Sequence, residues 1–172
     1  MPAGSGSAVV VRPVQLQDAA QLQANCLSQN TFEEVEWQIR DNLQAATEGR
    51  RLHLVAEVDG RVIGNAVVIR DQHPLRAHRA GLFSLVVSTP YQGRGIARRL
   101  VEEGCARAAA MGIEILETAC RGGEPAEAVY PRLGFIEYGR LPHGLREPGG
   151  THRVFDEVCF YRPTVPGPAA AT

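Results

Sequence analysis

The sequence contains no lysine, so all 18 of its strongly basic side chains are arginines. The 19 acidic residues outnumber them by one, which leaves a formal net charge of −1. A chain without excess positive charge lacks the electrostatic footprint of most proteins that bind phosphate backbones, so we expect no nucleic-acid partner. The missing lysine also excludes a Walker-type nucleotide-binding loop, whose lysine contacts the phosphates directly.

Long hydrophobic runs are missing as well. No segment reaches the roughly 18 consecutive apolar residues that a membrane-spanning helix needs, and residues 1–7 have neither the basic nor the apolar region of a secretory signal. We therefore expect a cytoplasmic protein with no membrane partner. The cysteines form no Cys-x-x-Cys pair and accompany no histidine cluster, which predicts free thiols and no metal site. They are Cys26, Cys105, Cys120 and Cys159.

The composition is typical of one soluble globular domain, with 44% hydrophobic and 22% charged residues in a chain of 172. Residues 1–7 are rich in glycine and serine and are predicted to be a disordered N-terminus. Residues 163–172 are rich in proline and alanine and are predicted to form a flexible C-terminal tail. The sequence between them has no linker and no repeat, so 8–162 is predicted to be a single domain.

Two kinds of hydrophobic pattern follow each other along this domain. The segments 52–58 and 61–69 flank Asp59-Gly60, which is a strong hairpin signal. Thr31 and Glu34 form a capping-box pattern at the start of a helix. In the second half of the chain strands alternate with helices, which favours at least one parallel strand pair. The other predicted strands are 8–11, 82–87, 113–118, 135–141 and 154–161, and the other predicted helices are 18–28, 96–110 and 125–133.

The most informative segment lies between the predicted strand 82–87 and the predicted helix 96–110. Gly93 and Gly95 flank Arg94 there, and glycines allow a tight turn and a close approach of the backbone to a ligand. The first N–H groups of the following helix have no intrahelical acceptor, and the helix dipole favours an anion. The arrangement is therefore typical of a pyrophosphate site. A purely structural turn is the alternative, and a dinucleotide fingerprint is excluded because its third glycine position is Arg98.

The loop Gln92-Gly93-Arg94-Gly95-Ile96-Ala97 resembles the Q/R-x-x-G-x-G/A loop of the GNAT superfamily, the GCN5-related N-acetyltransferases. The entry segment 86–90 and the later segment 128–135, with its Tyr and Leu-Gly-Phe, also resemble that family. The order of elements over 8–161 agrees too. The resemblance implies a mixed α/β fold: a central sheet of six to seven strands, antiparallel except for one splayed parallel pair, with about four flanking helices.

The resemblance further implies that acetyl-CoA is the co-substrate and that its acetyl group moves to a primary amine, which we expect to belong to a small molecule. In such enzymes the end of the strand before the loop pairs with the pantetheine arm, and the N–H groups of the loop hold the pyrophosphate. The residues in these positions are Leu85, Val86 and Val87 for the arm, and Gln92, Gly93, Arg94, Gly95, Ile96 and Ala97 for the pyrophosphate.

Catalytic groups are harder to assign. Tyr130 matches the family tyrosine, so the resemblance makes it the general acid that protonates the leaving thiolate, although it also lies on an apolar helix face and could belong to the core. Some relatives carry a glutamate early on the strand before the loop, but residues 80–84 contain no carboxylate. Glu117 near a strand end is one candidate for the general base, and His78 is another.

Other functions stay open from the sequence. The missing carboxylate permits a non-catalytic acyl-CoA-binding sensor or interaction module. Acetylation of a protein N-terminus fits a compact chain as well as a small-molecule amine does. A toxin that acetylates aminoacyl-tRNA is disfavoured by the near-neutral charge. A homodimer is compatible with the resemblance, because many relatives are dimers, and the polar segment 143–153 is a candidate specificity loop.

Overall fold

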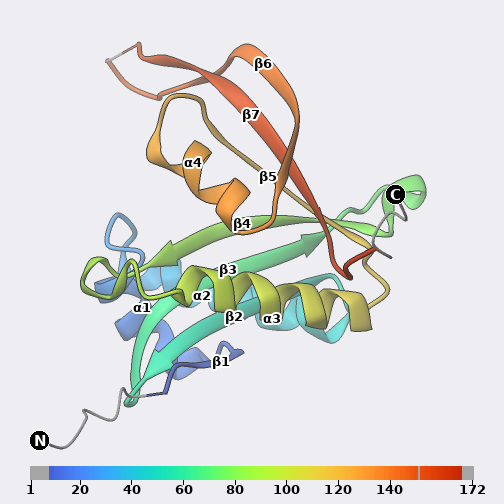
Figure 1. Ribbon diagram of the computed structural model, residues 1–172. Helices are drawn as coiled ribbons and strands as arrows, with labels where there is room; N and C mark the ends of the chain where they lie inside the picture. The colour runs from blue at the N-terminus through green and yellow to red at the C-terminus, as the bar shows by residue number, and fades with distance from the viewer. Residues whose placement is uncertain (1–7, 151, 168–172) are drawn as a thin grey trace, which may run out of the picture.

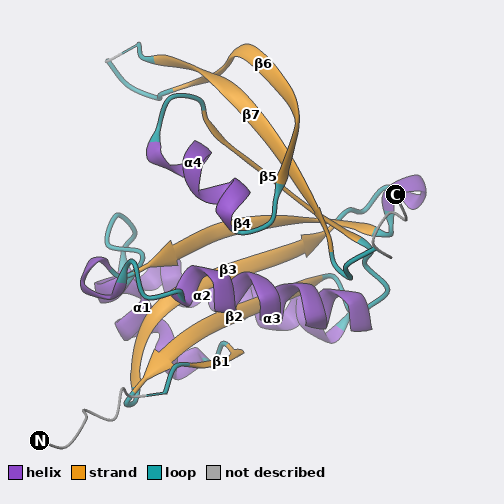
Figure 2. Cartoon of the chain, in the orientation of Figure 1, coloured by secondary structure: helices purple, strands orange, loops and turns teal. Residues whose placement is uncertain are grey.

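The computed structural model describes residues 8–150 and 152–167. Its centre is a seven-stranded sheet in the order β1-β2-β3-β4-β5-β7-β6 (Figure 1). Four α-helices and three short 3-10 turns connect the strands (Figure 2). The strands are β1 Val10–Pro13, β2 Arg51–Val58, β3 Arg61–Arg70, β4 Arg79–Val87, β5 Ile115–Arg121, β6 Ile136–Arg146 and β7 Val154–Pro163. The helices are α1 Ala19–Asn25, α2 Phe32–Thr47, α3 Ile96–Ala110 and α4 Pro125–Arg132.

The predicted fold class is confirmed. Within the described residues, β4 and β5 form the one parallel pair and the other neighbouring strands are antiparallel. No helix in these residues is long and apolar enough to cross a membrane.

Local sequence signals explain the first half of the sheet. The β2–β3 hairpin turns at Asp59 and Gly60, which both have positive φ, as the sequence predicts. The capping box at the start of α2 is present, because the Thr31 hydroxyl accepts from the Glu34 N–H and the Glu34 carboxylate accepts from the Thr31 N–H. Helices α1 and α2 cover one face of β2 and β3 around buried Leu22.

Helix α3 covers the opposite face, in front of the sheet in Figure 1. Its buried side chains include Leu100 and Val101, which belong to the main hydrophobic core. Gly64 of β3 allows the close approach, because a Cβ atom there would lie 3.0 Å from the Leu100 side chain and from Ala56. The core therefore fixes the position of α3, and with it the position of the loop that precedes it.

Strands β4 and β5 stay together only briefly. They pair over 79–81 and 115–117, and beyond Glu117 strand β5 pairs with β7 alone. Figure 1 shows β5, β6 and β7 rising away from the rest of the sheet. Strand β4 also carries a bulge, where Ser84 and Leu85 lie opposite the single residue Ala66, and Ser84 has φ of 49°. The bulge and the divergence together leave one edge of the end of β4 without a partner strand.

The C-terminal boundaries differ from the predictions. The predicted tail begins at Pro163, but Pro163 belongs to β7 and Thr164 is buried, with its hydroxyl donating to the Ile113 carbonyl at 2.8 Å. Strand β6 continues to Arg146, so Leu145 and Arg146 of the predicted loop 143–153 pair with β7. These extensions depend on pairing with strands far away in sequence. The predicted disordered segment 1–7 and the residues 168–172 of the predicted tail lie outside the described residues.

Candidate functional site

A groove of about 640 Å³ runs between the end of β4, the start of α3 and helix α4. Its position follows from the divergence of β4 and β5, because α4 packs beside β5 and leaves the end of β4 exposed. Arg98 of α3 donates to the Arg132 carbonyl of α4 at 2.7 Å and so connects the two helices across it. The groove is lined by Leu85, Val87, Tyr91, Gln92, Gly93, Gly95, Ile96, Ala97, Arg98, Pro125, Ala126, Val129, Tyr130, Arg132 and Leu133.

The backbone at the start of α3 is arranged to receive an anion. Gly93 and Gly95 have φ of 74° and 76°, and Gly95 is the N-cap of the helix. The Arg99 N–H makes the first bond, to the Gly95 carbonyl at 3.1 Å. Within the described residues, none of the six consecutive N–H groups from Gly93 to Arg98 has an acceptor. These donors, at the positive end of a 15-residue helix, form a candidate anion site.

The end of β4 presents a second set of free backbone groups. The Ser88 N–H donates to the Ile63 carbonyl of β3 at 2.8 Å. Because successive strand residues point their N–H groups to opposite sides, the N–H of Val87 points away from β3 and toward the divergence. The Val87 carbonyl accepts from the Gln92 side chain at 3.0 Å, which ties the loop to the strand.

Tyr130 lies on α4 at the wall of the groove. Its ring packs against Phe135 and Phe160, with centroid distances of 5.5 Å to each, so the side chain is part of the core on one side. Among the described residues its hydroxyl has no hydrogen-bond partner. The two interpretations of Tyr130, core residue and groove residue, therefore apply to different atoms of the same side chain.

A smaller hollow of about 410 Å³ lies beside the β4–β5 pair. It opens on the face of the sheet opposite α3, where Phe83 and Glu117 alternate with the core residues Leu82 and Leu116. Helices α1 and α2 cover β2 and β3 on this face and leave the hollow open. Glu117 lines it and accepts from Arg79 at 2.6 and 2.7 Å and from the Tyr138 hydroxyl at 3.0 Å. Phe83 and Glu157 complete its wall, from β4 and β7.

Hydrogen bonding controls the charge in this hollow. The bonds from Arg79, and secondarily from Tyr138, hold the pKa of Glu117 below its ordinary value despite partial burial. Burial and the bond to Glu117 raise the pKa of Tyr138 to about 12. Glu117 is thus ionised and Tyr138 neutral throughout the neutral pH range.

The family model described as "Acetyltransferase (GNAT) family" matches residues 16–135, which includes the glycine loop and the Tyr130 segment. The chain belongs to the GNAT acetyltransferase family. Enzymes of this family transfer an acyl group and use acetyl-CoA as co-substrate, which agrees with the anion site at the start of α3.

The chain is similar to several acetyltransferases. "N-alpha-acetyltransferase MAK3" of Arabidopsis thaliana is 33% identical over 115 residues, which are 62% of this chain and 55% of the relative. The chain thus spans about half the length of that curated relative. The crystal structure of ribosomal-protein-alanine N-acetyltransferase from Brucella melitensis superposes with a TM-score of 0.75 at 23% identity and covers 90% of this chain and 99% of its own. The crystal structure of a phosphinothricin acetyltransferase from Sinorhizobium meliloti in complex with acetyl-CoA superposes with a TM-score of 0.75 at 18% identity. The match covers 90% of this chain and 88% of that structure's chain.

Most of the residues that were predicted to bind acetyl-CoA line the groove, but Val86 and Arg94 do not. Val86 alternates with Leu85 and Val87, so its side chain points to the other face of the sheet. The Arg94 guanidinium lies 5.3 Å from the centre of the Tyr91 ring, while its backbone N–H stays in the anion site. The predicted residues that line the groove are Leu85, Val87, Gln92, Gly93, Gly95, Ile96 and Ala97.

Apart from Tyr130, sequence reasoning missed the residues of α4 that line the groove, and it missed the residues around Glu117. Tyr138 and Glu157 line the hollow from β6 and β7, and Arg79 of β4 pairs with Glu117. Polar and apolar residues do not alternate regularly along β5 and β7, so the sequence offered no local signal for this cluster. His78, the other candidate base, is exposed, and its carbonyl accepts from Glu114 at the start of β5.

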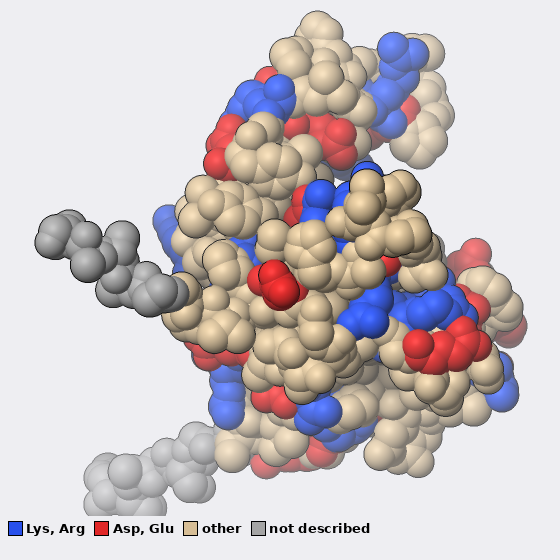
Figure 3. All heavy atoms as spheres, turned by 90° about the vertical axis from the view of Figure 1, so that its right-hand side faces the viewer, with Lys and Arg blue, Asp and Glu red and all other residues tan. Residues whose placement is uncertain are grey.

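The four cysteines are free, and Cys105 is buried. Burial raises the pKa of each thiol, for Cys26 to about 11, so none of them is an activated nucleophile. No cluster of metal-binding side chains occurs in the part of the chain that the structure describes. On the face shown in Figure 3, arginines and acidic residues are interspersed and no large patch of one sign is visible.

Proposed function

We propose that the protein transfers the acetyl group of acetyl-CoA to a primary amine. The observation that carries this proposal is the row of N–H donors from Gly93 to Arg98, which opens into a groove that ends at the unpaired edge of β4. The donors suit the pyrophosphate of coenzyme A. The free edge at Leu85 and Val87 suits the amide groups of its pantetheine arm, which would add to the sheet as a short strand.

The reaction needs few groups beyond these. A neutral amine attacks the thioester carbonyl, a C–N bond forms, the C–S bond breaks, and the amine gives up a proton. The Val87 N–H is our candidate donor to the oxyanion that develops on the carbonyl. The Tyr130 hydroxyl, which has no other partner in the described structure, is our candidate donor of the proton to the leaving sulfur.

Glu117 is our candidate for the group that receives the amine proton. It lies near the β4–β5 divergence, on the face opposite α3, so an amine in the hollow would approach the thioester from there. Its lowered pKa makes it a weak base. The carboxylate would therefore attract the ammonium form and act on the small neutral fraction, and the pKa of the amine would set the rise of activity with pH.

We propose a small-molecule amine as the acceptor, because the hollow of about 410 Å³ is the size of a small ligand site and combines three carboxylates with Phe83 and Tyr138. The α-amine of a protein N-terminus is the second candidate. It is favoured by the likeness to a plant N-alpha-acetyltransferase and to a bacterial ribosomal-protein-alanine N-acetyltransferase.

The test combines binding and turnover on the purified protein. Acetyl-CoA is titrated by calorimetry, which avoids thiol reagents that four cysteines would confuse. The protein is then incubated with acetyl-CoA and two panels, polyamines and amino acids in one and peptides with different N-terminal residues in the other. Mass spectrometry identifies the acetylated product and so separates the two acceptor classes.

Micromolar binding with turnover in either panel supports the proposal. Binding without turnover in both panels supports instead a non-catalytic acyl-CoA-binding module. If the folded protein does not bind acetyl-CoA, the proposed function is wrong.

A further inference from the structure

A chain of hydrogen bonds crosses the buried interior from α2 to the bulge of β4. Arg51 donates to the side-chain oxygen Oδ1 of Asn42 at 2.8 Å, and the side-chain nitrogen Nδ2 of Asn42 lies 3.0 Å from His53 Nδ1. His53 Nε2 lies 2.6 Å from Asn65 Oδ1, and the Asn65 amide nitrogen donates to the Ser84 carbonyl at 2.9 Å. His53 is 6% and Asn65 1% exposed, so water cannot replace these bonds.

The two ends of this hydrogen-bond chain determine the direction of every hydrogen bond between them. Arginine can only donate, so the Asn42 atom that faces Arg51 is oxygen, and its NH₂ group points at His53 Nδ1. A carbonyl can only accept, so the Asn65 atom that faces Ser84 is nitrogen, and its oxygen points at His53 Nε2. His53 must therefore accept at Nδ1 and donate at Nε2, which is the neutral imidazole in one tautomer.

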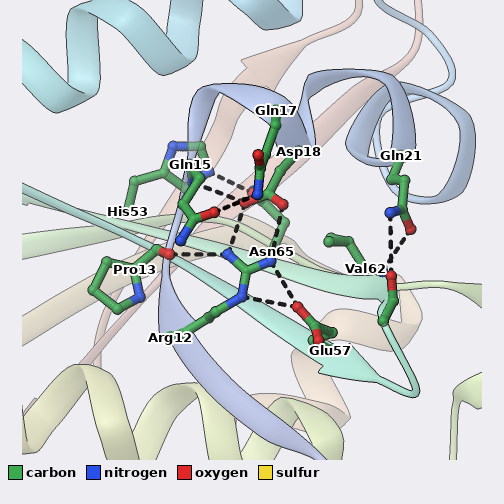
Figure 4. A network of polar contacts seen from close by, with 11 residues as sticks. Arg12, Pro13, Gln15, Gln17, Asp18, Gln21, His53, Glu57, Val62 and Asn65 are labelled. Carbon is green, nitrogen blue, oxygen red and sulfur yellow. Dashed lines mark hydrogen bonds and ion pairs between the residues drawn. The ribbon is translucent and has the colours of Figure 1, made fainter.

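The surroundings of His53 agree with the neutral form. Burial lowers the pKa of His53, and this outweighs the opposing effects of the bond to Asn65 and the charge of Asp18. Figure 4 shows His53 and Asn65 beside the cluster in which Arg12 pairs with both Asp18 and Glu57. The negative charge of Asp18 is thus already neutralised by Arg12, and it leaves the imidazole uncharged.

The last hydrogen bond of this network is accepted by the carbonyl of Ser84, a residue with a strained backbone. Ser84 has φ of 49°, a region that costs a non-glycine residue roughly 1–2 kcal/mol. It lies directly before Leu85 in the bulge that changes the register of β4 against β3. Without this bulge the backbone of Leu85 and Val87 would be shifted by one residue, and the groups that now face the groove would face the other edge.

We propose that Asn65, oriented by His53, is a positioning residue for acetyl transfer, because it holds the Ser84 carbonyl and thereby the part of β4 that receives the pantetheine arm. This inference rests on the proposed function. It predicts that the hydrogen-bond chain controls binding of the arm and leaves binding of the pyrophosphate at Gly93–Arg98 unchanged, since α3 is held by its own buried side chains, among them Leu100 and Val101.

The experiment compares Asn65→Leu, a replacement of similar volume, with the control Thr164→Val. Thr164 is also buried, and its hydroxyl also donates to a backbone carbonyl, that of Ile113 just before β5. Two ligands are titrated by calorimetry: acetyl-CoA, and 3′-phospho-ADP, the nucleotide half of coenzyme A without its arm. In Asn65→Leu we expect the Kd of acetyl-CoA to rise by about tenfold, the effect of one buried hydrogen bond, with the Kd of 3′-phospho-ADP unchanged.

A second pair of variants tests the role of His53 and does not depend on the folding of Asn65→Leu. His53→Gln keeps a donor near the position of Nε2, and His53→Leu has none. We expect His53→Gln to bind acetyl-CoA like the wild type and His53→Leu to weaken it about tenfold.

Three results would overturn the inference: equal weakening of both ligands in Asn65→Leu, no weakening at all, or the same weakening in Thr164→Val. Equal affinities in the two His53 variants would mean that His53 does not orient Asn65. Failure of the proposed function looks different, because the wild-type protein itself would then bind no acetyl-CoA.

Discussion

The two glycines at the ends of α3 allow the anion site to be tested with a matched control. Gly95 is the N-cap of the helix and has φ of 76°, and Gly112 follows its other end and has φ of 78°. A Cβ atom added at either position meets nothing within 4 Å. Replacement by alanine therefore has the same local cost at both ends, roughly 1–2 kcal/mol for the left-handed conformation.

The two variants should differ only in ligand binding. If the backbone of the Gly95→Ala variant relaxes toward negative φ at the substituted position, the N–H groups of residues 95 and 96 turn away from the anion. A hydrogen bond to a charged group contributes about 1.5–3 kcal/mol, so the loss of two weakens acetyl-CoA binding by at least about 100-fold. Gly112→Ala should bind like the wild type.

Thermal unfolding and calorimetric titration of both variants measure the two effects separately. We expect similar decreases in Tm, of a few degrees for a chain of this length, and a large rise in Kd for Gly95→Ala alone. Equal affinities in the two variants would refute the argument that the N–H groups at the start of α3 hold the pyrophosphate.

Three further predictions concern single side chains. Tyr130→Phe should lower kcat by about 100-fold or more. The KM for acetyl-CoA and the Tm should change little, because the ring contacts with Phe135 and Phe160 remain. A large fall in Tm with unchanged kcat would assign Tyr130 to the core alone. Glu117→Gln should lower kcat. The wild-type pH–rate profile should show no inflection from Glu117 above about pH 4.3, the ordinary glutamate value, because Arg79 and Tyr138 lower the pKa of Glu117 and the carboxylate stays ionised at all higher pH. An inflection near neutral pH that disappears in Glu117→Gln would contradict this. Thr31→Ala should reduce the free energy of unfolding by about 1 kcal/mol through loss of the N-cap and leave turnover unchanged; denaturant unfolding and steady-state kinetics measure these two, and altered turnover would mean that α2 also shapes the site.

Elements with local signals could be predicted closely from the sequence. Helix α3 occupies 96–110 as predicted, since Gly95 and the spacing of its apolar residues define both ends. The Asp59-Gly60 turn and the Thr31–Glu34 capping box formed for the same reason: each is a contact among neighbours in the chain. Strand β5, predicted over 113–118, instead spans Ile115–Arg121, because its last residues pair with β7 some 40 residues later.

The sequence by itself determined the fold class and the loop at the start of α3, because glycines, caps and hydrophobic spacing act over a few residues. Only the tertiary structure decided how the groove is completed by α4, which residues surround Glu117, and how Asn42, His53 and Asn65 connect α2 to Ser84. These groups come from separate elements, and their distances are fixed by strand order, by the bulge and by the divergence of β4 from β5. No pattern along the chain encodes such distances, since they are set by the packing of the whole domain.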